Sequence, residues 1–163
     1  MLTFSNTKKM INLIDSIVQS HRREVAASLK AGAGAFDEWD AKQVDTIFGY
    51  LFYNPGIPMS WGCEDFAAVH HSGRIGLKFH VSGFKFTGII IVCYNEGRDY
   101  YEIWKQPEGS NGNGERFAED VCFADLVAFI DAEVETDDPE GDDYQTKAGN
   151  FVANLNGLFN AKP

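Results

Sequence analysis

The segment RIGLKFHV, residues 74–81, alternates strictly between apolar and polar side chains. A period of two is typical of a β-strand that lays one face on a hydrophobic core. Ser-Gly pairs at 72–73 and 82–83 bracket the segment and predict tight turns into neighbouring strands. The chain must therefore fold around an antiparallel sheet.

The flanking residues predict a meander of about four strands, near 66–71, 74–81, 84–94 and 99–106. The first of these could instead be a short helix that starts at Ser60, and both alternatives stay open. A two-residue turn at Ser82 and Gly83 would set Val81 opposite Phe84. In that register one sheet face is apolar throughout and is the expected core face, with Ile75, Leu77, Phe79, Val81, Phe84, Phe86, Ile90, Val92, Tyr94, Tyr101 and Ile103.

The opposite sheet face is neither cleanly polar nor cleanly apolar. Ile89, Ile91 and Trp104 would be poorly placed in water, so we expect a helix, a second copy of the chain or a ligand to cover them. Basic and aromatic side chains that share a surface are typical of sites for nucleic acids or other anionic ligands. The alternative ligand face predicted here comprises Arg74, Lys78, His80, Lys85, Tyr100 and Trp104.

Apolar residues at a spacing of three and four predict helices that precede and follow the strands along the chain. The first covers 7–31 and ends at Gly32, and the second begins at Asp40, which has capping-box spacing to Gln43. The pattern returns in 123–134, and a last helix would carry one apolar face with Tyr144, Ala148, Phe151, Leu155 and Leu158. The predicted fold class is α+β, an antiparallel meander packed against amphipathic N-terminal and C-terminal helices.

Length and composition predict a single domain over 1–163. The chain is 44% hydrophobic, which suffices for one core but is short for two. No apolar run approaches the roughly 18 to 20 residues of a spanning helix, and the N-terminus lacks the pattern of a secretion signal. We expect a cytoplasmic protein without a membrane partner, with Cys63, Cys93 and Cys122 as buried, reduced thiols.

Residues with catalytic or metal-binding chemistry do not form a recognisable motif. His70 and His71 would point to opposite faces of a strand, and His80 shares its face with lysines that repel a cation. The glycine-rich loop 109–114 lacks the lysine of a phosphate loop. No metal, cofactor or catalytic residue is predicted. The sequence favours a protein without enzymatic activity, and an unrecognised hydrolase is a second alternative.

Negative charge is concentrated in the last third of the chain. The net charge is −10, and residues 107–163 hold thirteen acidic and three basic side chains. The run EVETDDPEGDDYQ, residues 133–145, has seven carboxylates and no positive charge. Turn formation and helix capping explain some of these residues, and solubility could explain the rest. A surface that carries only negative charge also attracts basic partners.

The leading hypothesis is a non-enzymatic binding protein with a basic protein partner. Examples are a phosphate-mimicking inhibitor of a basic nucleic-acid-binding protein and a toxin-neutralising protein. The predicted partner-binding residues are Asp125, Asp131, Glu133, Glu135, Asp137, Asp138, Glu140, Asp142 and Asp143. The overall acidity disfavours direct nucleic-acid binding, and a homodimer is a further alternative.

Overall fold

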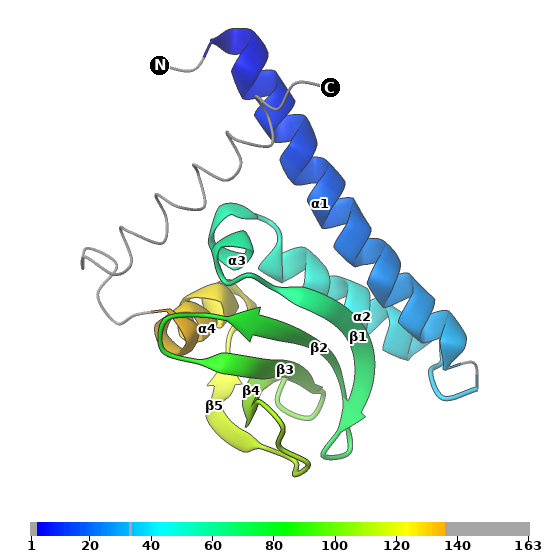
Figure 1. The fold of residues 1–163 in the computed structure, drawn as a ribbon. Helices are drawn as coiled ribbons and strands as arrows, with labels where there is room; N and C mark the ends of the chain where they lie inside the picture. The colour runs from blue at the N-terminus through cyan, green and yellow to red at the C-terminus, as the bar shows by residue number, and fades with distance from the viewer. Residues whose placement is uncertain (1–2, 33, 136–163) are drawn as a thin grey trace.

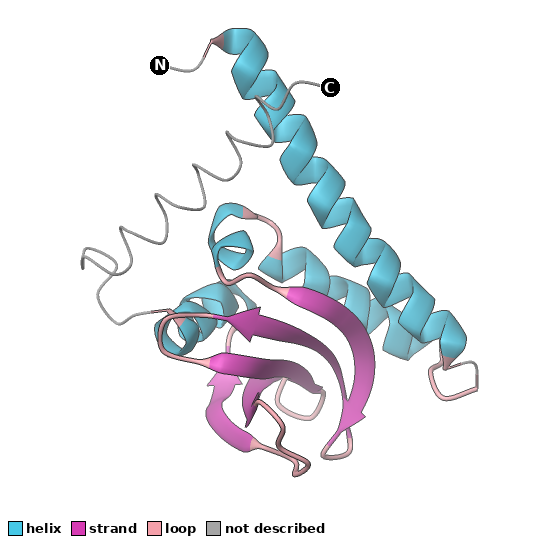
Figure 2. Ribbon diagram, in the orientation of Figure 1, coloured by secondary structure: helices cyan, strands magenta, loops and turns pink. Residues whose placement is uncertain are grey.

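The computed structural model describes residues 3–32 and 34–135 and has an α+β fold, as predicted (Figure 1). Its helical elements are α1 (Phe4–Ala31), α2 (Glu38–Leu51), α3 (Gly56–Ser60), the 3-10 turn η1 (Phe123–Asp125) and α4 (Leu126–Val134). Its strands are β1 (Glu64–His71), β2 (Arg74–Ser82), β3 (Thr87–Asn95), β4 (Tyr100–Pro107) and β5 (Glu115–Val121). They form one antiparallel sheet, drawn in magenta in Figure 2, and pair in the order β1-β2-β3-β4-β5. The helix predicted from Tyr144 to Leu158 lies outside the described residues.

The sheet has a fifth strand, β5, which follows the glycine-rich loop. The sequence pattern did not predict this strand. Tyr101 pairs with Val121 and Ile103 pairs with Ala118, so β5 advances by three residues where β4 advances by two. The extra residue lies in a bulge where Asp120 has a φ of 54°. The two buried side chains of β5 are therefore three positions apart, and the strand shows no alternation to recognise.

The turn between β2 and β3 differs from the predicted two-residue turn. Val81 pairs with Gly88 rather than with Phe84, and a four-residue loop, 83–86, connects the strands. The shift is an even number of residues, so side chains keep their predicted faces. Phe84, by contrast, is an exposed loop residue instead of a member of the core.

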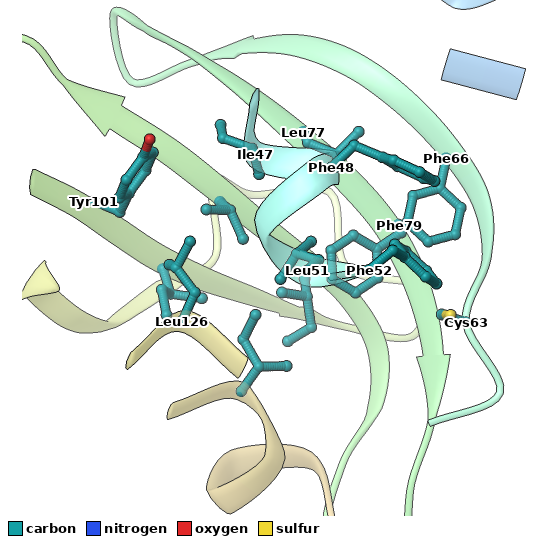
Figure 3. Packing of buried hydrophobic residues seen from close by; sticks show 14 of the residues in the cluster. Ile47, Phe48, Leu51, Phe52, Cys63, Phe66, Leu77, Phe79, Tyr101 and Leu126 are labelled. Carbon is teal, nitrogen blue, oxygen red and sulfur yellow. The ribbon is translucent and has the colours of Figure 1, made fainter. Parts of the chain in front are cut away.

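The hydrophobic core lies between the sheet and α2. Val44, Ile47, Phe48 and Leu51 all face the sheet and are buried, as the apolar period predicts. Rings from several elements meet there: Phe48 stacks on Phe52, and Phe66 stacks on Phe79 (Figure 3). Burying such a side chain contributes roughly 1.5 to 3 kcal/mol. Helix α2 lies over β2, α1 packs along β1, and α4 adds its buried side chains to the core.

Helices α1 and α2 both begin a few residues earlier than predicted. The α2 capping box joins Asp37 to Asp40, whose side chains each accept a hydrogen bond from the other residue's backbone N–H. For α1 the N-cap is Thr3, whose hydroxyl accepts from the Asn6 N–H. Serine, threonine and aspartate all satisfy free N–H groups in this way, so neighbouring candidates are hard to separate by sequence.

Helix α1 closes the outer edge of β1. The Glu24 carboxylate accepts a 2.9 Å hydrogen bond from the Phe66 N–H, and the Ser28 hydroxyl accepts one of the same length from the Ala68 N–H. An edge strand otherwise presents free N–H groups that invite pairing with another chain. The N-terminal half of α1 extends beyond the sheet (Figure 1). No helix of the described residues has the length and apolarity needed to cross a bilayer.

Candidate binding surfaces

Helix α4 is fixed to the body of the protein at its C-terminal end. The carbonyl of Val134 accepts hydrogen bonds from the backbone N–H groups of Lys85 and Phe86, at 2.9 and 3.3 Å. The Lys85 ammonium group also donates to the Ala132 carbonyl at 2.7 Å. At Gly83 an added Cβ would lie 2.1 Å from the Val134 oxygen, so only glycine permits this approach. The chain therefore leaves the described domain from a fixed point.

The predicted acidic residues of this region do not all face solvent. Asp131 accepts a 2.9 Å hydrogen bond from the indole Nε1 of Trp61, and Glu133 pairs with Lys105. Glu135 is only 1% exposed. Asp125 is exposed. The other five predicted partner-binding residues, Asp137, Asp138, Glu140, Asp142 and Asp143, lie outside the described residues.

A polar cluster lies on the sheet face opposite the core, and we call it the inner sheet face: His71, Arg74, Glu102, Trp104 and Arg116. Glu102 is 5% exposed and is its centre. The guanidinium Nε of Arg74 forms an ion pair with one carboxylate oxygen of Glu102 at 2.9 Å, and Arg116 approaches the other carboxylate oxygen at 3.7 Å. The indole of Trp104 donates to Glu102 at 3.2 Å. One buried carboxylate thus holds two arginines and an aromatic ring.

His71 completes this cluster from β1. Its ring packs edge to face on Trp104, with the ring centroids 4.8 Å apart. Burial lowers the pKa of His71 below the ordinary value of 6.5, and a hydrogen bond to the Asn113 backbone and the charge of Glu102 oppose this shift only in part. The imidazole is therefore neutral at physiological pH. His70, on the opposite face of β1 as predicted, contacts the Ala35 carbonyl instead.

The structure brings together only part of the predicted ligand face. Arg74 and Trp104 meet at Glu102, whereas His80 pairs with Glu64 and Glu108. Lys85 was expected on this face but belongs to the loop that holds α4, because the turn is longer than predicted. Lys78 is half-buried on β2, and Tyr100 is exposed at the start of β4.

Two members of the inner sheet face were missing from the predicted set. Arg116 lies on β5, the strand that the sequence analysis did not predict, so nothing placed it beside Trp104. From the sequence, His71 was considered only as a possible metal ligand and was not assigned to this face. The mixed polarity of the face was the one sequence signal that pointed to this cluster.

Two of the three thiols, those of Cys63 and Cys93, are buried. Burial raises the pKa of both Cys63 and Cys93 to about 12, which keeps these thiols protonated and unreactive at neutral pH. Within residues 3–32 and 34–135, no three histidine, cysteine, aspartate or glutamate side chains are grouped to hold a metal ion.

An apolar groove of about 880 Å³ lies among α2, α3 and α4, and we call it the helical groove. Its lining residues are Tyr50, Tyr53, Asn54, Ile57, Phe123, Ala124, Val127, Ala128, Asp131 and Ala132. Tyr53 is 91% exposed and Phe123 is 53% exposed, an unusual amount for large aromatic side chains. Contiguous exposed apolar surface of this kind makes the helical groove a candidate interaction site.

No family model matches this chain, and no match is found among curated proteins or solved structures. The fold class is α+β, and the function must be argued from the surfaces themselves.

Proposed function

We propose that this protein is a non-enzymatic binding protein that docks its acidic C-terminal third on a basic protein partner. The observation that carries the proposal is the fixed end of α4, where Val134 accepts two backbone hydrogen bonds from the 83–86 loop. The sequence that follows this point has five carboxylates between residues 137 and 143. A charged segment that starts from a fixed point loses less conformational freedom on binding than one on a free tether.

The acidic residues divide into two groups under this proposal. Asp131 and Glu133 hold α4 through Trp61 and Lys105, and Glu135 is buried, so these three act as positioning residues. The docking role falls to Asp125 and to the residues that continue the acidic run: Asp137, Asp138, Glu140, Asp142 and Asp143.

The partner is a protein with a basic surface, such as a nucleic-acid-binding protein or a cationic toxin. Carboxylates that occupy a surface built for phosphates block it by charge complementarity. The complex is therefore expected to form rapidly at low salt and to weaken as salt screens the charges.

The test compares two variants with the same change in net charge. The first carries Asp138→Asn, Glu140→Gln and Asp142→Asn. The matched control carries Asp15→Asn, Glu38→Gln and Glu96→Gln, which removes three exposed carboxylates elsewhere. Tagged full-length proteins are incubated with cell lysate and washed with increasing salt, and mass spectrometry identifies the retained proteins.

A basic protein that binds wild type and the control, is released by salt and is lost from the first variant would support the proposal. Equal retention by both variants would show that position in the acidic run is irrelevant. That result would refute the docking role.

A second candidate function, binding of an anionic ligand, is favoured by the inner sheet face. Arg74 and Arg116 remain 36% and 43% exposed while Glu102 holds them beside Trp104. Guanidinium groups next to an aromatic ring suit the phosphates and bases of a single-stranded nucleic acid. The probe is a fluorescent single-stranded oligonucleotide, measured by anisotropy. Weaker binding by Arg116→Ala and by Lys78→Glu, but not by the acidic-run variant, would favour this function over the first.

A further inference from the structure

The helical groove has the shape and chemistry of a surface that packs against another helix. Ala124, Ala128 and Ala132 follow one another at intervals of four and line it. Small side chains in one row let a second helix approach closely. At the rim, Phe123 stacks on Tyr50 with ring centroids 4.8 Å apart, and Tyr53 is almost fully exposed.

The chain itself continues from the edge of this groove. Asp131 and Ala132 line the groove, and α4 ends at Val134. The sequence runs on for residues 136–163, which the structure does not describe. Eight residues, 136–143, precede residue 144, and a flexible chain of eight residues spans about 16 Å on average and more when extended. Any apolar segment beyond residue 143 is therefore within reach of the groove.

In a helix, the sequence beyond residue 143 would place its apolar side chains on one face. At 100° per residue, the apolar side chains fall within about 120° of one another, and they are Tyr144, Ala148, Phe151, Val152, Leu155, Leu158 and Phe159. Polar and small residues such as Asn150 and Asn156 fall on the other side. An amphipathic segment of this kind needs an apolar surface to cover it, since helices of this length are marginal alone in water.

We infer that residues 144–159 of this same chain occupy the helical groove. A short connection gives the segment an effective concentration in the millimolar range at the groove, which a separate partner seldom reaches. Docking would cover Tyr53 and Phe123 and would hold the acidic run 137–143 against the end of α4. The inference concerns the groove alone and does not depend on a basic partner.

The test uses trypsin cleavage after Lys147 in the full-length protein, followed by intact mass spectrometry. Four variants are compared with wild type. Leu155→Asp breaks the apolar face, and Asn156→Asp adds the same charge on the polar face as its matched control. Ala128→Glu blocks the groove at an exposed position, and Ile11→Glu changes the exposed part of α1 as a second surface. Thermal unfolding checks that each variant is folded.

We expect cleavage after Lys147 to be about tenfold faster in Leu155→Asp and Ala128→Glu than in wild type, which corresponds to about 1.4 kcal/mol of docking free energy. Asn156→Asp and Ile11→Glu should match wild type. Equal rates in all five proteins would overturn the inference. Loss of protection in Ile11→Glu alone would place the segment on α1 instead. Protection that grows with protein concentration would mean that a second copy fills the groove, which also overturns it.

Discussion

His71 on β1 and Trp104 on β4 lie in ring contact, with centroids 4.8 Å apart, although β2 and β3 separate their strands. In a flat sheet those strands would be about 14 Å apart. The sheet is therefore strongly curled, and its inner face closes on itself at this end. The curl explains why Glu102 and Cys93 are buried on a face that the core helices do not cover.

Replacing Glu102 by alanine is expected to destabilise the protein by about 2 to 3 kcal/mol, because two arginines would lose their shared counter-charge and the Trp104 indole its hydrogen-bond acceptor. Because the arginines are partly exposed, the expected loss of unfolding free energy is at the low end of the range for breaking a buried ion pair. The measurement is urea unfolding followed by circular dichroism. Glu119→Ala, which breaks an exposed contact of Arg116, is the control and should cost about 0.5 kcal/mol or less. Equal costs would mean that Glu102 does not hold the inner sheet face together.

Two glycine-to-alanine substitutions should change the free energy of unfolding in opposite directions. At Gly76 an added Cβ would lie 2.4 Å from the Val92 carbonyl oxygen and 3.1 Å from the Cys93 sulfur, so Gly76→Ala must push β2 away from β3. A loss of about 2 kcal/mol or more is expected. At Gly49, inside α2, an added Cβ meets nothing within 4 Å. Gly49→Ala should stabilise the protein by about 0.5 to 1 kcal/mol through helix propensity. Thermal unfolding of both variants decides whether the inner face requires this close approach.

Acid should destabilise the protein in part through His71. Burial lowers the folded pKa of this group below the unfolded value of 6.5, so the unfolded state binds the proton more readily. The stabilising effect of the neutral imidazole is present above pH 6.5 and is lost as the pH falls towards the folded pKa. In His71→Gln the stability difference between pH 7.5 and pH 5 should be smaller than in wild type. A pH slope in His71→Gln that matches the wild-type slope would contradict the prediction.

The three cysteines should differ in reactivity towards a thiol reagent such as Ellman's reagent at pH 8. Cys63 and Cys93 are buried, with pKa values of about 12, and should stay unmodified in the folded protein. Cys122 is partly exposed and should be the one that reacts. In denaturant all three thiols should react. Rapid modification of more than one thiol in the native protein would show that the sheet opens more easily than its packing implies.

Much of the secondary structure could be predicted because it depends on neighbours in the chain. The alternation from Arg74 to Val81 identified β2, and the apolar period from Val44 to Leu51 identified the buried face of α2. The bulge at Asp120 removed the same signal from β5, and the equivalent bulge at Asp65 separates Glu64 from the regular part of β1. Where an extra residue interrupts the pairing, the periodicity that sequence reasoning depends on disappears.

The candidate surfaces were predicted less well than the strands. The acidic run was visible as composition, but which carboxylates hold α4 and which face outward depends on Trp61 and Lys105, both distant in sequence. Likewise, the sequence assigned Arg74 and Trp104 to one face. Arg116 and His71 lie beside them because β5 pairs with β4 and the sheet curls.

By itself, the sequence determined the fold class, most of the strands and helices, and which side chains of β2, β3 and β4 share a sheet face, because all of these follow from the side-chain pattern along a short stretch of chain. Only the tertiary structure decided the register of β2 on β3, the curl that buries Glu102 and the groove among α2, α3 and α4. These features arise from close approaches between distant segments, such as Gly76 against Val92 and Gly83 against Val134, where the shape of both partners sets the distance.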